Sequence, residues 1–391
     1  MELKEILDIY HSPLLELLYR AATVHREHHN PREVQISTLL SIKTGGCSED
    51  CAYCPQASRY FTGVENSGLM SVDQVRDAAL QAKAGGSSRL CMGAAWRNVR
   101  DNDEFDHVLN LVRTVNGLDM EVCATLGMIT EHQAQRLADA GLYAYNHNLD
   151  SSEDYYKEII STRGYQDRLD TLANARKAKL TLCSGGIIGM GESALDRCKM
   201  LLTLSQLDPV PESVPINALV AVEGTPLENQ QTIPIWEMIR MIAITRIVIP
   251  STTIRLSAGR TQMTQEGQAM CFLAGAASIF AGDKLLTTPN PEVSADMELF
   301  NTLGLEPQTA FSKHPQPISK AADEKPEKSS EPIRWSRPSH TIPANKEYAM
   351  LGKQKRAEHK QKQKEEHPLT TSDYLKHANI SDVLKHSTKH E

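Results

Sequence analysis

The sequence predicts an α/β protein whose core is a (β/α)8 barrel, preceded by a helical segment and followed by a low-complexity tail. Between residues 34 and 288, eight apolar, β-rich runs alternate with segments of helical periodicity. Strands that alternate with helices form right-handed βαβ units, and eight such units in about 250 residues are enough to close a barrel. An open, doubly wound sheet is the alternative that this pattern leaves.

The elements follow in chain order. Residues 1–33 mix acidic and apolar residues at helical spacing, which predicts helices ahead of the barrel. The expected strands are the runs at 34–44, 88–96, 120–127, 143–150, 180–190, 213–222, 252–259 and 278–288. Two intervening helices carry start and stop signals, because 71–86 opens on Ser71 and 130–141 opens on Thr130, and both end in glycine. We therefore expect three parts: a helical segment over 1–33, a barrel over 34–311 and a tail over 312–391.

Charge separates the tail from the rest of the chain. The 391 residues carry a net charge of −7, yet from Lys313 to Glu391 basic residues outnumber acidic ones by five. The acidic remainder argues against a nucleic-acid-binding core, which would carry a basic face. The tail has few large apolar residues, so we expect it to be mostly disordered. One stretch, 372–387, spaces Leu375, Val383 and Leu384 as in a short amphipathic helix.

The first twenty residues and the cysteine content indicate the compartment. MELKEILDIYHSPLLELLYR lacks the basic-then-apolar order of a signal peptide, and no apolar run is long enough to span a bilayer. We therefore expect a cytoplasmic protein with no membrane partner. In that reducing compartment the eight cysteines are not expected to form disulfides, so clustered cysteines favour metal or redox chemistry.

Three cysteines lie in one loop directly after the first predicted strand. The stretch GGCSEDCAYCPQ spaces Cys47, Cys51 and Cys54 as C-x3-C-x2-C. A closed zinc site or an ordinary four-cysteine cluster needs a fourth ligand, and this stretch contains neither a fourth cysteine nor a histidine. Either another segment supplies that ligand or one metal corner stays open. Because barrels carry their active sites on the loops that follow the strands, the position of the triplet predicts a site.

Two later stretches place polar or flexible residues at strand ends. In YNHNLD, Asn146, Asn148 and Asp150 alternate, so on a regular strand they point to one side. Buried polar groups need hydrogen-bonding partners, which either a ligand or water at an exposed strand end would provide. GGIIGMGE forms a glycine-rich turn but lacks the patterns of a phosphate-binding loop. Its notable residues are Gly185, Ile187, Gly189 and Glu192.

Three further cysteines and one arginine are expected inside the barrel. Cys91, Cys123 and Cys183 belong to the second, third and fifth strands, and interior positions of different strands converge toward the barrel axis. Any one of them alone would be interpreted as a small buried apolar residue. Arg255 in the seventh strand is flanked by apolar residues, and a guanidinium inside a barrel needs an anionic partner. A metal cluster held by three thiolates is one candidate for that anion.

The C-x3-C-x2-C triplet at the end of a barrel strand resembles the signature of the radical S-adenosylmethionine enzymes. The resemblance implies that Cys47, Cys51 and Cys54 hold three irons of a [4Fe-4S] cluster and that the fourth iron binds S-adenosylmethionine. It implies that the reduced cluster cleaves this cofactor to a 5'-deoxyadenosyl radical, so no side chain is expected as catalytic acid, base or nucleophile. The expected cofactor contacts are Tyr53, Asn148, Asp150, Gly185, Ile187, Gly189 and Glu192.

Longer strings, among them CMGAAW, ESVPIN, RLSAGR and KLLTTPNP, resemble the members of this superfamily that insert sulfur into dethiobiotin. The resemblance extends over about residues 5–308 and does not include the tail. It implies a flavodoxin- or ferredoxin-type electron donor, a homodimer, and a second cluster, a [2Fe-2S] centre that is the sulfur source. The implied ligands of this second cluster are Cys91, Cys123, Cys183 and Arg255. The implied dethiobiotin contacts are Asn146, Asn148 and Asn217.

Two other functional classes stay open at this stage. One is a zinc- or cluster-bearing sensor without catalysis. The other is a radical enzyme of similar architecture with a different product, such as a thiazole-forming or hydrogenase-cofactor-forming barrel. Relatives of the second kind are not expected to carry all four of the implied second-cluster ligands, so these residues discriminate between the classes.

Overall fold

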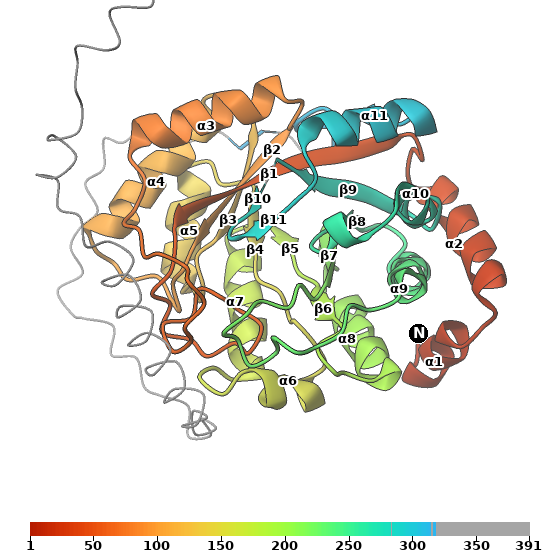
Figure 1. Ribbon diagram of the computed structural model, residues 1–391. Helices are drawn as coiled ribbons and strands as arrows, with labels where there is room; N and C mark the ends of the chain where they lie inside the picture. Colours follow the sequence, from red (N-terminus) through yellow and green to blue (C-terminus); the bar gives the residue numbers. More distant parts are fainter. Residues whose placement is uncertain (283, 314–315, 318–391) are drawn as a thin grey trace, which may run out of the picture.

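The computed structural model describes residues 1–282, 284–313 and 316–317. Within them, parallel strands form a closed barrel surrounded by helices (Figure 1). The barrel strands are β1 (Glu33–Lys43), β2 (Arg89–Ala94), β3 (Glu121–Thr125), β4 (Ala144–Asn146), β5 (Thr181–Cys183), β7 (Ser213–Ala218), β8 (Thr253–Leu256) and β9 (Ala276–Ala281). Because β9 pairs again with β1, the sheet has no free edge along this path. The predicted eight-stranded α/β barrel is confirmed, and the open sheet is excluded.

The helices cover the outside of the barrel. In chain order they are α3 (Val72–Ala84), α4 (Asp103–Asn116), α5 (Glu131–Asp139), α6 (Glu153–Ile159), α7 (Tyr165–Lys177), α8 (Ala194–Gln206), α9 (Ile235–Val248), α10 (Gln265–Leu273) and α11 (Val293–Leu303). The predicted caps are present. Ser71 and Thr130 each accept a hydrogen bond from the backbone N–H three residues later, which fixes the starts of α3 and α5.

The fifth and eighth predicted strands are each interrupted. β5 ends at Cys183, and β6 (Gly186–Ile188) pairs with β7. Gly185 lies so close to β7 that an added Cβ would sit 2.0 Å from the carbonyl oxygen of Pro215, so only glycine fits at this break. The run at 278–288 divides into β9 and a hairpin of β10 (Lys284–Leu285) and β11 (Thr288–Pro289). This hairpin lies over the carboxyl end of the barrel, at the cavity described below.

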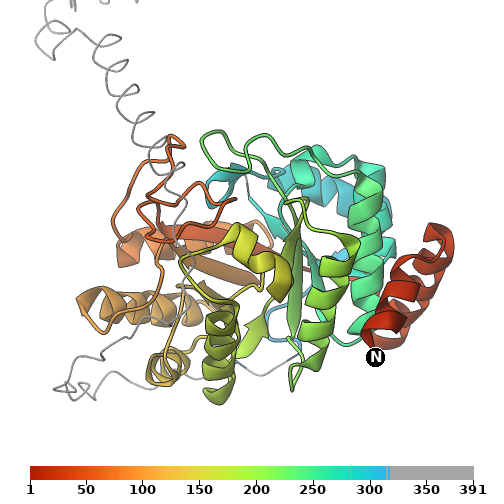
Figure 2. The same cartoon turned by 90° about the horizontal axis from the view of Figure 1, so that it is seen from below.

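Both ends of the described chain pack on the barrel. At the N-terminus, α1 (Leu3–Tyr10) and α2 (Leu14–His28) lie against α8 and α9 (Figure 2). After α11, β12 (Glu306–Pro307) pairs in parallel with the start of β1, which places it at the base of the barrel. Most of the expected tail, including the amphipathic stretch at 372–387, lies outside the described residues. In the part of the chain that is described, no helix is both long and apolar enough to span a bilayer.

Candidate active site

The carboxyl ends of the barrel strands surround one cavity of about 340 Å³. Its walls come from the triplet loop, the ends of β2 to β4, β7 and the β10–β11 hairpin. Such a position is where barrel enzymes place their active sites. Of the residues singled out from the sequence, those that line it are Cys47, Cys51, Tyr53, Cys54, Cys91, Cys123, Asn146, Asn148, Asp150, Ile187 and Asn217.

The triplet loop is a compact turn whose three thiols border the cavity. The N–H of Cys54 donates to the carbonyl of Cys51 at 2.9 Å, and the N–H of Cys47 donates to the carbonyl of Gln56 at 3.0 Å. Burial raises the pKa of the Cys51 thiol and raises that of Cys54 to about 12. A bound cation would be needed to ionise these thiols near neutral pH.

The donor set of this loop fits an iron–sulfur cluster. Cysteine thiolates are the ordinary ligands of such clusters. Among the residues that the structure describes, no group of three or more His, Cys, Asp or Glu side chains is arranged to hold a single metal ion. In a cluster each thiolate binds a different iron, so the sulfurs lie farther apart than they do around one ion.

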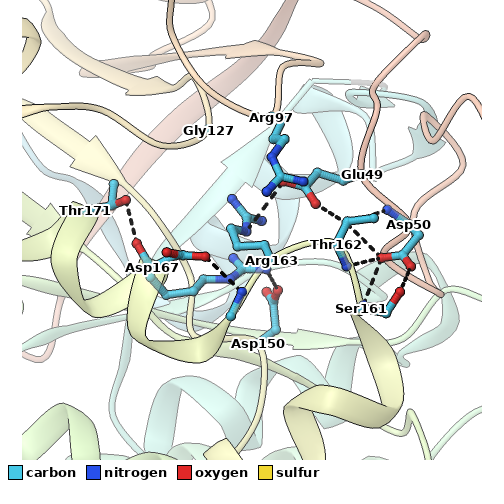
Figure 3. A network of polar contacts seen from close by, with 12 residues as sticks. Glu49, Asp50, Arg97, Gly127, Asp150, Ser161, Thr162, Arg163, Asp167 and Thr171 are labelled. Carbon is cyan, nitrogen blue, oxygen red and sulfur yellow. Dashed lines mark hydrogen bonds and ion pairs between the residues drawn. The ribbon is translucent and has the colours of Figure 1, made fainter. Parts of the chain in front are cut away.

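Two acidic residues within the triplet tie its loop to the chain after α6 (Figure 3). The Asp50 carboxylate accepts hydrogen bonds from the backbone N–H groups of Ser161 at 2.9 Å and Thr162 at 3.1 Å. The Glu49 carboxylate accepts one from the Thr162 hydroxyl. It also lies 3.7 Å from Nε of Arg97 and 3.8 Å from Nε of Arg163. The sequence does not predict these contacts, because Asp50 and Ser161 are 111 positions apart.

A buried trio of side chains stands at the cavity wall beside the triplet. The Tyr53 hydroxyl donates to Asp150 at 2.8 Å, and Arg168 forms an ion pair with the same carboxylate. Burial, with the charge of Asp150, raises the pKa of Tyr53, so the phenol stays protonated and acts as a donor. Arg168 also donates to the hydroxyl of Tyr156 at 3.0 Å. The sequence does not predict the role of Arg168, because no neighbouring residue marks it as a partner of Asp150.

The YNHNLD stretch does not keep the alternation expected of a strand. β4 ends at Asn146, and Asp150 has a φ of 67° and forms an isolated bridge with Gly186. Because the chain turns here, His147 lines the cavity together with Asn146, Asn148 and Asp150. Burial holds the pKa of His147 well below its usual value, so this imidazole is neutral.

The glycine-rich turn contributes one side chain to the cavity and shapes the wall with the others. Ile187 lines the cavity, and the N–H of Gly185 donates to Oδ1 of Asn148 at 3.2 Å. The Glu192 carboxylate accepts hydrogen bonds from the N–H groups of Gly189 and Met190, both at 2.9 Å or less. Its contribution is therefore to hold the turn in shape rather than to border the cavity.

Asn217 on β7 is fixed at both ends of its side-chain amide. Its Nδ2 donates to the carbonyl of Gly186 at 3.0 Å, and its Oδ1 accepts from the N–H of Ala258 at 3.2 Å. These contacts hold the amide at the cavity wall. Asn217 lies within the strand and does not terminate it, since β7 continues to Ala218.

At the inner end of the cavity, three cysteines and Arg255 meet in the barrel interior, and two of them, Cys91 and Cys123, line the cavity itself. Cys91 and Cys123 are register partners on β2 and β3. A hydrogen bond from Cys123 lowers the pKa of the Cys91 thiol. Nη1 of Arg255 lies 3.7 Å from Sγ of Cys183, and Nδ2 of Asn146 lies 3.2 Å from the same sulfur. The structure thus brings together residues from β2, β3, β5 and β8.

Arg255 is fully buried and held by neutral groups. Its Nε donates to Ser278 at 2.9 Å, and its Nη2 donates to Gln35 and Ser37, each at 3.2 Å. None of the ion pairs found among the described residues involves Arg255. A buried guanidinium without a carboxylate is unfavourable unless another anion is present. An anionic cluster on the three neighbouring thiolates fits this layer.

Comparison with known families and proteins agrees with this geometry. The radical SAM superfamily model matches residues 41–204, and the biotin and thiamin synthesis associated domain matches residues 215–306. The chain is 69% identical to the biotin synthase of Christiangramia forsetii over 353 residues, which cover 90% of this chain and 97% of that protein. It is 59% identical to the mitochondrial biotin synthase of Arabidopsis thaliana over 305 residues, 78% of this chain and 81% of that protein.

Two solved structures resemble the barrel. Methylornithine synthase (PylB) gives a TM-score of 0.67 at 15% identity, covering 78% of this chain and 94% of that one. The FeFe-hydrogenase maturase HydG from Carboxydothermus hydrogenoformans gives 0.68 at 16% identity, covering 80% and 77%. These identities show the fold alone. The high identity to curated relatives over most of the sequence shows more: the chain belongs to the biotin synthase family of radical S-adenosylmethionine enzymes.

Proposed function

We propose that this chain inserts sulfur into dethiobiotin to form biotin and that two clusters share its barrel. The ligands of the [4Fe-4S] cluster are Cys47, Cys51 and Cys54. The ligands of the [2Fe-2S] cluster are Cys91, Cys123, Cys183 and Arg255. The observation that carries the proposal is that thiols of both sets line one cavity, with a buried, unpaired guanidinium next to the second set.

The clusters, when bound, supply the electron that cleaves S-adenosylmethionine and the sulfur that enters the product. The residues of the chain bind and orient. Tyr53 and Asp150 present a hydroxyl and a carboxylate whose positions are fixed by Arg168, which suits recognition of a ribose and an amino-acid group. The proposed cofactor contacts are Tyr53, Asn148, Asp150, Gly185, Ile187, Gly189 and Glu192, the last acting through the turn that it holds.

The substrate contacts that we propose are Asn146, Asn148 and Asn217. All three border the cavity, and Asn146 also contacts Cys183, so it lies between the cavity and the second set of thiols. A cyclic urea offers two N–H donors and one carbonyl acceptor, which side-chain amides match. Leu285 and Leu286 of the hairpin add apolar surface that would exclude water from an alkyl chain.

The wider setting is also proposed. A flavodoxin- or ferredoxin-type protein would supply the electron, and the enzyme would act as a homodimer. A cytoplasmic location is proposed as well, since a reducing compartment would keep the thiols of both sets available to bind clusters. The proposed division into a helical segment (1–33), a barrel (34–311) and a tail (312–391) is supported at its first boundary by the start of β1 at Glu33.

The proposal is tested by anaerobic reconstitution with iron and sulfide, followed by metal and sulfide analysis, absorption spectra and turnover of dethiobiotin. We expect wild-type protein to bind both clusters and form biotin. A Cys91→Ala variant should keep the [4Fe-4S] spectrum and the cleavage of S-adenosylmethionine but form no biotin. A sensor without catalysis would instead bind iron and release neither methionine nor biotin.

A further inference from the structure

The base of the barrel, opposite the cavity, is covered by the chain that follows α11. We call residues 305–313 the base strap. Its β12 pairs with Glu33 and Val34 of β1. The N–H of Glu306 donates to the carbonyl of Arg32 at 2.7 Å, and that of Gln308 donates to Val34 at 2.9 Å. The strap is therefore anchored as an additional strand rather than lying loosely on the surface.

Phe311 is the part of the strap that closes the barrel. Its N–H donates to Oε1 of Glu121 at 2.8 Å, and its ring lies edge-on to Tyr143 with 5.6 Å between ring centroids. Phe311 packs against the same apolar cluster that contains Cys91 and Cys123. It adopts a φ of 58°, a conformation that a bulky residue rarely takes without tertiary contacts to hold it.

One layer of side chains separates the strap from the four proposed ligands. This layer consists of the residues two positions before each proposed ligand in the same strand, which are Arg89, Glu121, Thr181 and Thr253. Positions i and i+2 lie on one face of a strand, roughly 7 Å apart. Between this layer and Gln308, Ser312 and Lys313 of the strap there remains a cavity of about 20 Å³, enough for one water molecule. Little free volume therefore remains between this layer and the strap.

A chain of hydrogen bonds connects the strap to Arg255. Nη2 of Arg255 donates to Oε1 of Gln35 at 3.2 Å, and Nε2 of Gln35 donates to Oε2 of Glu121 at 3.0 Å. The same Glu121 oxygen lies 2.6 Å from Arg89, and the other accepts from Phe311. Both carboxylate oxygens of Glu121 are therefore used, and the position of the strap bears on the position of the arginine.

We propose that the base strap is the floor of the second-cluster site. Phe311 blocks access from the base to the thiols of Cys123 and Cys183, while Gln35 and Glu121 act as positioning residues for Arg255. The identity of the cluster rests on the proposed function. The claim that Phe311 blocks access to these thiols from the base does not depend on it. Cys183 is the most informative reporter, because it does not line the upper cavity and a route through the base would expose it.

The first test uses full-length, cluster-free protein and follows alkylation of each cysteine by mass spectrometry. Phe311→Ala should accelerate labelling of Cys183 about tenfold, as expected for a newly opened local route. Phe311→Leu should restore most of the protection. The matched control, Leu303→Ala, removes a partly exposed side chain on α11 and should change nothing.

Cys198 and Cys271 distinguish local opening from general loosening, because both are buried in the helical layer, on α8 and α10. Their labelling should stay at the wild-type rate in Phe311→Ala. The proposal that the strap is a floor would be wrong if the labelling rate of Cys183 did not change. It would also be wrong if labelling of Cys183, Cys198 and Cys271 accelerated equally.

The second test uses reconstituted protein. In Phe311→Ala a chelator should bleach the [2Fe-2S] absorption about tenfold faster, and the [4Fe-4S] absorption at the wild-type rate. Glu121→Gln should shift the [2Fe-2S] spectrum in the same direction as Arg255→Ala, and an unshifted spectrum would refute the positioning role. If wild-type protein binds no [2Fe-2S] cluster while Cys183 still responds to Phe311→Ala, the floor stands and the proposed function fails.

Discussion

The guanidinium of Arg255 lies 3.7 Å from the sulfur of Cys183 in the interior of the barrel. An arginine side chain stays charged at all accessible pH values, which makes it a poor metal ligand unless it gives up a proton. Ser278, Gln35 and Ser37 fix its position. We therefore regard its main contribution as electrostatic, balancing an anionic cluster that the three thiolates bind.

This view predicts that Arg255 is replaceable and that Cys183 is not. Arg255→Lys and Arg255→Ala should assemble both clusters and still form biotin, at rates about 10- to 100-fold lower, with altered [2Fe-2S] spectra. Cys183→Ala should form none. Absorption spectra and product assays check both expectations. An inactive Arg255→Ala protein without [2Fe-2S] absorption would make the arginine an obligatory ligand.

The two cysteine sets are predicted to be independent. Cys47→Ala should abolish cleavage of S-adenosylmethionine while the [2Fe-2S] signal survives, because the two proposed clusters share no ligand. Release of methionine and the absorption spectrum report the two effects separately. Cys198→Ala, which changes a buried cysteine in α8 outside both sets, should behave as wild type. Simultaneous loss of both clusters in Cys47→Ala would contradict the prediction.

The glycine-rich turn is predicted to depend on Arg197, which pairs with Glu192 at 2.8 Å and donates to the hydroxyl of Tyr10 at 2.9 Å. Arg197→Met leaves the buried Glu192 carboxylate without its cation, so stability should fall by about 3 kcal/mol. We expect KM for S-adenosylmethionine to rise more than kcat falls, because the turn orients and does not react.

The matched control for this variant is Lys199→Met. Lys199 lies on α8, as Arg197 does, and forms an exposed ion pair with Asp154 of α6. Thermal unfolding and steady-state kinetics of the control should match wild type, since exposed pairs contribute little. A normal KM in Arg197→Met would show that the turn keeps its shape without the arginine.

Deletion of residues 318–391 is predicted to leave turnover unchanged and the melting temperature within about 2 °C of full length, because the tail has few large apolar residues to bury. The sequence places the tail boundary at 312, but Lys313 contacts Thr253 and Gln316 contacts the carbonyl of Asn116. The cut should therefore fall after residue 317. Loss of soluble protein on this deletion would show that the tail packs on the barrel.

The histidine pair at the end of α2 predicts acid sensitivity. Burial, with the nearby charge of Arg246, lowers the pKa of His25 and of His29 to about 3. Arg26 and Lys313 also face His25 and act in the same direction. A histidine whose folded-state pKa is depressed stabilises the fold fully above its unfolded pKa, and this contribution is lost as pH falls from about 6.5.

For the buried His25, this loss of unfolding free energy would reach at most about 1.4 kcal/mol per pH unit below 6.5. His25→Leu should flatten the dependence of unfolding free energy on pH between 6.5 and 5, and urea titrations at several pH values measure it. A slope in His25→Leu equal to that of wild type would contradict the assignment.

Local signals in the sequence predicted the barrel well. Strand composition and the caps at Ser71 and Thr130 depend on neighbours within a few residues, so they are visible in the sequence. The alternation in YNHNLD predicts a continuous strand, and this prediction was wrong. β4 ends at Asn146, and Asp150 pairs with Gly186 instead. Arg168 and Arg163 could not be identified, since their carboxylate partners become neighbours only when the barrel closes.

The contacts of Asp50 with residues 161 and 162 have a consequence for how iron is acquired. They order the cysteine loop through contacts within the polypeptide, so conformational entropy of this segment is lost as the chain folds. We therefore expect iron to bind a loop that is already in shape, with little further loss of conformational entropy.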